Sequence, residues 1–178
     1  MNHELRAAAI LKRVKPGQTV VEVGVFRGEM TELLALAGVN VIMVDDWLPG
    51  HSQPLRYRRT GDYHTKLGTP SINRARRQAK HIASQYAGLV SLLEMRSVDA
   101  ARHTPDRSID LVFLDADHSY EGVKQDWHEW LPKVVPGGYI GGHDYGDKRF
   151  GVKRAVDESL AFWHKLELDN NLTWFVQQ

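Results

Sequence analysis

The sequence predicts an α/β domain in which a mostly parallel sheet carries helices on both of its faces. Strand and helix patterns alternate along the chain, and the strand segments are almost entirely apolar, as in TVVEVGV and IDLVFL. Such strands are typical of a parallel sheet that is buried on both sides. Near the end, Asn170-Asn171 separates the runs LEL and LTWFV, which predicts an antiparallel hairpin.

The first quarter of the chain has clear signals for four elements. Apolar residues near helical spacing predict a short amphipathic helix over 3–13. The β-branched run TVVEVGV predicts a strand over 19–25. A helix is expected after Gly28 through about Ala37 and ends at Gly38, because glycine is favoured just after a helix. The apolar run VNVIMV then predicts a second strand over 39–44.

The segment 47–70 is rich in proline and glycine and predicts a loop inserted before the next helix. Ser71 follows Pro70 and is the expected N-cap of a helix over 71–87. The expected elements after it are strands over 89–94 and 109–114, a helix over 120–130, a turn at 136–138, a strand over 139–142, a helix over 151–163 and the terminal hairpin.

Composition excludes several classes of protein. The 178 residues fit one globular domain, 1–178, and contain no cysteine, which excludes disulfide scaffolds, thiolate metal sites and a cysteine nucleophile. The net charge of +1 gives no overall field toward nucleic acid or membrane. No apolar run approaches the roughly 20 residues of a membrane span, and the polar start MNHELR does not resemble a signal peptide. A soluble, cytoplasmic protein without a membrane partner is expected.

Polar residues gather after the predicted strands. In a parallel sheet, ligands bind at the carboxyl ends of the strands, so these residues are expected to share one rim. The rim would hold at least six carboxylates, two histidines and a glycine loop. Its members are Gly24–Gly28 after the first strand, Asp45 and Asp46 after the second, Ser97, Val98 and Asp99 after the third, Asp115–His118 after the fourth, and His143 and Asp144 after the fifth.

The first of these loops reads Glu22-x-Gly24-x-x-x-Gly28-x-x-Thr31. Its glycine spacing differs from the G-x-G-x-x-G of dinucleotide sites, and an acid inside the strand suits an ammonium group better than a diphosphate. The alternative is a tight turn with no ligand. Asp45 follows the second strand, where a carboxylate can accept both hydroxyls of a ribose. Asp46 competes for that role, and a solvated turn acid is the alternative for both.

Four segments resemble one family: VVEVGVFRGEMT, VIMVDDW, SIDLVFLDADHSYEGVKQDWHEWLPKVVPGGYIGGHDY and GVKRAVDE. They are similar to the class I S-adenosylmethionine-dependent methyltransferases, in particular to the branch that methylates hydroxyl groups of small molecules, such as macrolide sugars and catechols. The resemblance covers about residues 18–160. It implies a Rossmann-like fold and S-adenosylmethionine as cofactor.

The resemblance also implies roles for individual residues. Asp45 matches the ribose-binding acid, and Ser97 and Val98 match positions that flank the adenine. The residues expected to bind the cofactor are Glu22, Gly24, Val25, Phe26, Gly28, Thr31, Asp45, Asp46, Ser97, Val98, Asp115 and Ala116.

A metal site is implied as well. Asp115 and Asp144 match metal-ligating aspartates of the Mg²⁺-dependent members, and His143 stands where relatives often have a further acid. Because histidine is a poor Mg²⁺ ligand, the alternatives are Mn²⁺ or a similar ion, two aspartates with water, or no metal. His118 falls where these enzymes carry the catalytic base, which suits proton removal near neutral pH. A hydrogen-bonded loop histidine is the alternative.

The segment 56–80 carries eight lysines and arginines against one aspartate, a local net charge of +7. It could receive an anionic acceptor or nucleic acid, and an ordinary solvated helix is the alternative. The chain is short for the family, so the acceptor pocket is expected to be open or completed by a second subunit of a homo-oligomer. The expected reaction is methyl transfer to a small-molecule hydroxyl. The alternatives are a nucleic-acid methyltransferase and a relative that binds the cofactor without transferring a methyl group.

Overall fold

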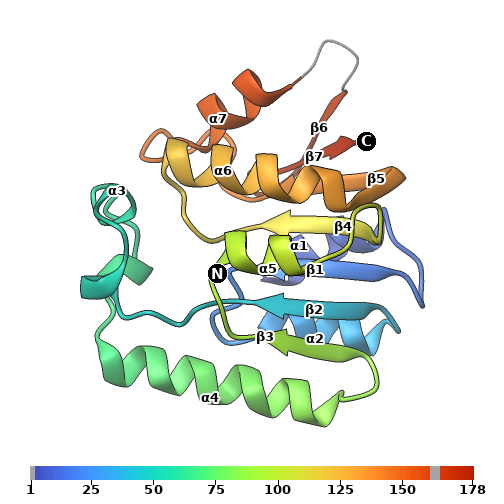
Figure 1. Ribbon diagram of the computed structural model, residues 1–178, viewed down its shortest axis with the longest axis horizontal. Helices are drawn as coiled ribbons and strands as arrows, with labels where there is room; N and C mark the ends of the chain where they lie inside the picture. Colours follow the sequence, from blue (N-terminus) through green and yellow to red (C-terminus); the bar gives the residue numbers. More distant parts are fainter. Residues whose placement is uncertain (1–2, 161–164) are drawn as a thin grey trace.

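The computed structural model describes residues 3–160 and 165–178. These residues form a seven-stranded sheet in the order β3-β2-β1-β4-β5-β7-β6 (Figure 1). Strands β1 to β5 are parallel, and the last two pair antiparallel, so the predicted fold and its terminal hairpin are confirmed. The strands are β1 Thr19–Val23, β2 Asn40–Val44, β3 Val90–Leu93, β4 Ile109–Leu114, β5 Val134–Gly142, β6 Leu166–Asp169 and β7 Thr173–Gln177.

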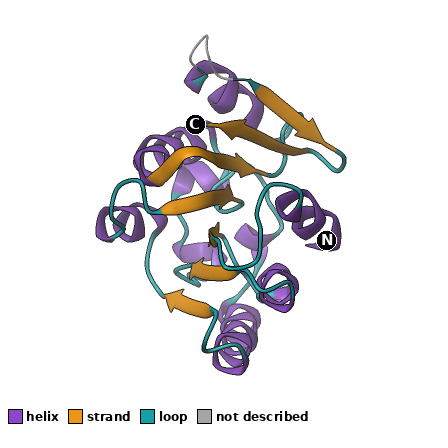
Figure 2. Cartoon of the chain, turned by 90° about the vertical axis from the view of Figure 1, so that its right-hand side faces the viewer, coloured by secondary structure: helices purple, strands orange, loops and turns teal. Residues whose placement is uncertain are grey.

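Helices cover both faces of the sheet, as Figure 2 shows end-on. The α-helices are α1 His3–Leu11, α2 Glu29–Leu36, α3 Leu55–Arg58, α4 Thr69–Gln85, α5 Ser97–His103, α6 Tyr120–Trp130 and α7 Val152–Ser159. Helices α1, α2 and α4 pack on one face with Val20 and Leu111, whereas α5, α6 and α7 pack on the other with Val21 and Val112. Adjacent residues of each strand therefore face opposite cores, which explains why both must be apolar.

Several predicted boundaries differ from the structure. The segment 47–70 is not plain loop, because it contains α3 and two 3-10 turns, η1 Gly50–Ser52 and η2 His64–Lys66. Helix α4 begins at Thr69 with Gly68 as its N-cap, so Ser71 lies inside the helix and is not its cap.

The later half of the chain shows further differences. Ser97, Val98 and Asp99 begin the unpredicted helix α5 and are not loop residues. Strand β5 begins at Val134, earlier than predicted, because Val134 pairs with Ile109 before a register irregularity. The helix predicted over 151–163 is described as α7, and the end of the predicted range, 161–164, lies outside the described residues. Within the described part of the chain, no helix is both long and apolar enough to cross a membrane.

Candidate cofactor and metal site

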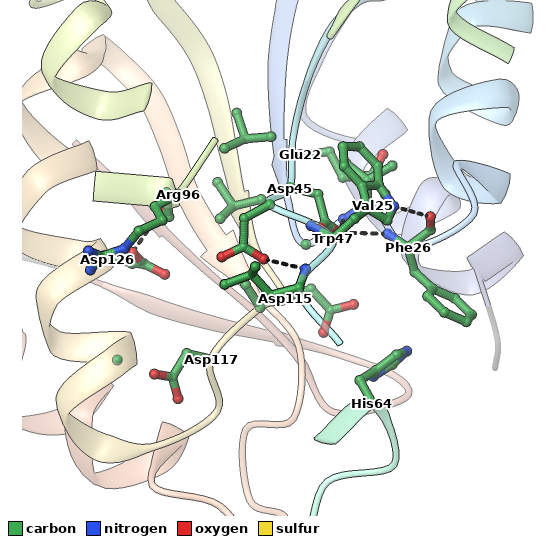
Figure 3. Close-up of a pocket in the computed structure, with 18 of the residues that line it drawn as sticks. Glu22, Val25, Phe26, Asp45, Trp47, His64, Arg96, Asp115, Asp117 and Asp126 are labelled. Carbon is green, nitrogen blue, oxygen red and sulfur yellow. Dashed lines mark hydrogen bonds between the residues drawn. The ribbon is translucent and has the colours of Figure 1, made fainter. Parts of the chain in front are cut away.

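A cavity lies at the carboxyl ends of strands β1 to β4 (Figure 3). Ten of the twelve residues predicted to bind the cofactor line it: Glu22, Gly24, Val25, Phe26, Asp45, Asp46, Ser97, Val98, Asp115 and Ala116. The other two lie behind its wall. Thr31 donates a hydrogen bond to Glu22, and Gly28 packs against the side chains of Met43 and Ile82.

The glycine loop needs Gly24 for steric reasons. Gly24 has φ +91°, and a Cβ there would overlap the backbone carbonyl of Asp115. The absence of a side chain therefore lets the end of β1 approach the end of β4. Two further residues of this wall have left-handed backbone, Phe26 at φ 55° and Trp47 at φ 43°. Trp47 Nε1 donates a 2.8 Å hydrogen bond to the Phe26 carbonyl, which ties the two strained positions together.

Asp45 and Asp46 differ in how much of their carboxylate is already used. Asp45 accepts three backbone N–H groups, from Val25 at 3.0 Å, Phe26 at 2.9 Å and Trp47 at 2.7 Å. Asp46 accepts one, from Leu48 at 3.0 Å. A carboxylate has about four acceptor positions. Asp45 thus holds the glycine loop to the end of β2, and Asp46 keeps more capacity for a ligand.

Glu22 lies at the bottom of the cavity and is only 3% exposed. Burial raises the pKa of Glu22 to about 8, although the hydrogen bond from Thr31 acts in the opposite direction. At pH 7 the side chain is therefore mostly protonated in the free protein. A cation placed beside it would favour the carboxylate.

A second buried acid, Asp126, was missed by the sequence reasoning. It lies on α6, is 6% exposed and lines the cavity beside the end of β3. Ser97 Oγ donates to Asp126 Oδ1 at 2.6 Å, and Trp130 Nε1 donates to Ser97 Oγ at 2.9 Å. Burial raises the pKa of Asp126 to about 7. The available signal was its spacing, because it shares the apolar face of α6 with Val123 and Trp130.

His118 is surrounded by carboxylates on both sides of its ring. Its Nε2 lies 3.3 Å from Asp115 Oδ1 and 3.4 Å from Asp144 Oδ2, and its Nδ1 lies 3.2 Å from Asp62 Oδ2. Burial opposes the charged imidazole, but the hydrogen bonds to Asp115 and Asp62 outweigh it and raise the pKa of His118 to about 10. Asp115, His118 and Asp144 each present a ligand atom within 4.8 Å of the others.

The carboxylate oxygens of Asp115 and Asp144 that point away from His118 contact other side chains. Arg6 Nη1 donates to Asp115 Oδ2 at 2.5 Å, and His143 Nδ1 lies 2.9 Å from Asp144 Oδ1. His143 thus supports Asp144 from behind and lies 4.0 Å from the nearer oxygen of Asp115. Sequence reasoning missed Arg6 and Asp62, because both reach the centre from elements far away in the chain. His118 takes the position among the three donors that was predicted for His143.

The comparisons with known proteins decide the family. Residues 21–145, more than half of the chain, match the Methyltransferase domain family. The chain belongs to this family. It carries a methyltransferase domain, as the resemblance implied. A 60-residue stretch is 35% identical to the Uncharacterized protein y4gI of Sinorhizobium fredii (strain NBRC 101917 / NGR234), and it covers 34% of this chain and 7% of that protein.

Solved structures share the methyltransferase's fold at low identity. The O-methyltransferase NovP is 18% identical, with a TM-score of 0.64 over 99% of this chain and 77% of NovP. An rRNA methylase from Streptococcus thermophilus is 16% identical, with a TM-score of 0.59 over 99% and 92% of the two chains. SMU.1697c from Streptococcus mutans, solved in complex with SAH, is 13% identical, with a TM-score of 0.61 over 98% and 94%.

The cavity of the methyltransferase fits the cofactor chemically. Gly24 lines its wall next to β1 without a side chain, and Glu22 there suits an ammonium group. Free acceptor positions on Asp46 suit ribose hydroxyls, and the apolar side chains of Met95 and Val98 suit a purine ring.

The three converging donors of the methyltransferase also fit a divalent metal ion. The second atom of each donor has a polar neighbour: Arg6 beside Asp115, His143 beside Asp144, and the Asp62 carboxylate beside His118. A metal-bound histidine commonly donates its other N–H to a carboxylate, which fixes the tautomer that the metal needs. Ligand atoms 3.3 and 3.4 Å apart are compatible with metal–ligand bonds of about 2.1 Å.

The basic segment of the methyltransferase extends over the cavity. Figure 1 shows α3 beyond the carboxyl ends of the strands, and its Arg56 Nε lies 3.0 Å from Asp117 Oδ2. Arg76 and Lys80 both pair with Glu94. Three of the eight cations of the segment are thus neutralised by acids of the chain, which leaves five exposed cations: Arg58, Arg59, Lys66, Arg74 and Arg77. Their predicted role toward an anionic partner stays a prediction.

Proposed function

We propose that this methyltransferase methylates a hydroxyl group of a small molecule, assisted by a divalent metal ion bound to Asp115, His118 and Asp144. The observation that carries the proposal is the convergence of these three donors, each held from behind by a second residue. Such a complete outer layer is typical of metal sites and is more than an ordinary cluster of surface charges has.

Methyl transfer to oxygen requires alignment of the acceptor and removal of its proton. The acceptor oxygen forms a bond to the methyl carbon, the C–S bond breaks with its electron pair going to sulfur, and the hydroxyl proton passes to water. A divalent metal ion, when bound, lowers the pKa of a coordinated hydroxyl and orients its oxygen. One imidazole and two carboxylates suit Mn²⁺ or a similar transition metal better than Mg²⁺.

The residues around the proposed metal site have different roles. Asp115 and Asp144 supply negative charge at the end of β4 and just after β5. Asp62 fixes the ring of His118, so that Nε2 faces the two aspartates. Without a metal, the same arrangement holds His118 as an imidazolium, which cannot accept a proton. With Nε2 on a metal ion and the Nδ1 proton held by Asp62, His118 would have no free lone pair either, so the proposal gives it the role of a ligand in place of the predicted role of general base.

The test is an acceptor screen with radiolabelled S-adenosylmethionine. Phenols, catechols and sugar hydroxyls are assayed with metal-free enzyme, alone and with added Mn²⁺ or Mg²⁺, and an RNA oligonucleotide is included as a separate acceptor. We expect label in a hydroxyl acceptor only when metal is present. Asp144→Asn should lose this activity, whereas Asp157→Asn, an exposed acid on α7, should retain it. Full turnover by metal-free enzyme, or label in RNA alone, would contradict the proposal.

A further inference from the structure

Residues 50–67 form one wall of the cavity and fold as a small unit of their own on the surface. We propose that these residues, the cap, open to exchange the cofactor and close over it when it is bound. The inference rests on the S-adenosylmethionine cofactor of the proposed function, but on neither its acceptor nor its metal ion.

The two ends of the cap meet in a narrow neck. The Gly50 N–H donates a 2.8 Å hydrogen bond to the Leu67 carbonyl. A Cβ at Gly50 would overlap the Thr65 carbonyl, so glycine at this position lets the two ends approach each other. Surface loops whose ends are close and whose own side chains pack together form compact units. The cap is therefore joined to the body of the protein by two adjacent chain segments.

Hydrogen bonds inside the cap maintain its shape. The carboxylate of Asp62 accepts a hydrogen bond from the Tyr57 hydroxyl at 3.1 Å and another from the His64 backbone N–H at 2.7 Å. The carbonyl of Asp62 accepts a 2.6 Å hydrogen bond from the Thr65 hydroxyl. Donors and acceptors of these bonds all belong to the cap, so the bonds persist when the cap moves as a rigid unit about its neck.

Few contacts hold the cap against the body of the protein. Of the described residues 50–67, only Leu67 packs against either hydrophobic core. The Arg56 side chain reaches the body, with Nε 3.0 Å from Asp117 Oδ2 and Nη2 3.2 Å from Gln125 Oε1. Arg56 is 39% exposed, so water competes for this ion pair and its strength is modest. Segments with few buried apolar contacts open locally at low free-energy cost.

The cap covers the cavity from the side opposite the start of α6. Its lining residues are Gln53, Pro54, Arg56, Tyr57 and His64. Figure 3 shows His64 of the cap and Asp117 of the opposite wall apart from each other across the cavity. The contact of Arg56 with Asp117 bridges these two walls. A cofactor in the cavity lies behind this bridge, so its exchange requires the bridge to open.

The cap also reaches the proposed metal centre. Asp62 Oδ2 lies 3.2 Å from His118 Nδ1, and the Tyr57 ring meets the His118 ring edge-on with the centroids 6.0 Å apart. Both contacts come from the cap, so its opening withdraws them from His118. Under the proposed function, methyl transfer then needs the closed cap, whereas cofactor exchange needs the open one.

The test locks the cap and, separately, loosens it. Because the chain contains no cysteine, two introduced cysteines are the only sites for a bis-maleimide. In Arg56→Cys/Gln125→Cys, this reagent replaces the contact between the two side chains by a covalent bridge. Arg56→Gln removes the ion pair and adds no bridge. Trp47 lines the cavity, so stopped-flow tryptophan fluorescence can follow the binding and release of S-adenosylhomocysteine.

The two changes should have opposite effects on the release of S-adenosylhomocysteine. The bridge should slow both association and dissociation by at least about tenfold relative to the unbridged double variant, as expected for a lid that must open. Arg56→Gln should speed dissociation about two- to fivefold, the value of one partly exposed ion pair. Loss of a direct contact between Arg56 and the ligand would instead speed dissociation in both proteins. Glu121→Cys/Gln125→Cys, bridged within α6, is the control and should exchange ligand like its own unbridged form.

Equal exchange rates in bridged and unbridged Arg56→Cys/Gln125→Cys would overturn the inference. Hydrogen exchange gives an independent check, because the amides of 50–67 should exchange faster than those of β1 and β4 and should slow when S-adenosylhomocysteine binds. Cap amides as protected as those of the two strands in the free protein would overturn it as well. Neither measurement needs a methyl acceptor or a metal ion, so the failure of metal-assisted hydroxyl methylation would leave both results interpretable.

Discussion

Arg6 Nη1 donates a 2.5 Å hydrogen bond to Asp115 Oδ2, which joins the first helix to the end of the fourth strand. The side chains of Arg6 and Asp115 are only 14% and 11% exposed. Burial opposes the ionised Asp115, but the charges of Arg6 and His118 outweigh it and lower the pKa of this acid. The Arg6 guanidinium therefore places a positive charge of the protein itself beside the proposed metal centre.

Without the Arg6 cation, the free energy of unfolding should depend more strongly on bound Mn²⁺. Arg6→Gln removes one of the two cations beside the buried Asp115, and the loss of a partner from comparable buried pairs costs about 3 kcal/mol. Calorimetric unfolding of metal-free protein should show this loss, and Mn²⁺ should restore more stability to the variant than it adds to wild type. Arg27→Gln, a largely exposed arginine near the same cavity, is the control and should change neither value. An equal Mn²⁺ effect on all three proteins would contradict this role of Arg6.

His118 and His143 should differ in their effects on metal affinity. If His118 is the third ligand, His118→Ala should abolish Mn²⁺ binding at micromolar concentrations. His143→Gln removes the contact with Asp144, together with contacts to Arg6 and Asn171, and should weaken binding by about 10- to 100-fold, as losses in the outer layer do. Titration with Mn²⁺ monitored by electron paramagnetic resonance measures both. The reverse order of effects would return the ligand role to His143, as the sequence had suggested.

The fold was predictable because its signals are local. Apolar runs mark each parallel strand, and the glycine and proline turns between them are short. Helix α5 was missed because SVDAARH is short and polar, and its buried residues are mostly alanines. The early start of β5 was missed because Pro136-Gly137 is typical of a turn, whereas pairing of Val134 with Ile109 is a tertiary contact.

The site was predictable only as far as the strand-end rule reaches. That rule brings together Asp115, His118 and Asp144, because strand ends in a parallel sheet share one edge. It contains no information about helices and loops that cover this edge. Arg6 lies 109 positions from Asp115, and Asp62 lies 56 positions from His118, so only the folded chain shows these contacts. The same contacts explain why His118, and not His143, lies in the cluster with Asp115 and Asp144.

Substitutions of Asp45 and Asp46 should differ in their effects on the stability of the glycine loop and on cofactor affinity. Asp45→Ala removes the acceptor of three backbone N–H groups and should lower both the thermal transition and the affinity for S-adenosylhomocysteine. Asp46→Asn should lower the affinity by about ten- to hundredfold and leave the transition unchanged, because in the described part of the chain only the Leu48 N–H donates to it. Calorimetric titration and thermal unfolding of each variant provide the two values. Unchanged affinity in Asp46→Asn would assign the ribose to Asp45.

The raised pKa of Glu22 should make the free energy of unfolding fall as the pH rises. Its pKa is about 8 in the folded protein against an ordinary value of 4.5, because burial disfavours the carboxylate. Between these values the folded state holds a proton that the unfolded state has lost, so stability falls with rising pH by up to about 1.4 kcal/mol per unit. Denaturant unfolding from pH 5 to 8 should show this slope in the difference between wild type and Glu22→Gln. A constant difference would contradict the raised pKa.

The same proton should leave when the cofactor binds. An ammonium group beside Glu22 favours the carboxylate, so binding at pH 7 should release about one proton that Glu22→Gln does not release. Calorimetric titrations of S-adenosylhomocysteine in two buffers of different ionisation enthalpy count released protons directly. Asp126 is present in both proteins and contributes equally, so the difference between them belongs to Glu22. Equal proton release would mean that the ammonium group does not lie beside Glu22, and the acid would then serve only to hold Thr31 and the glycine loop.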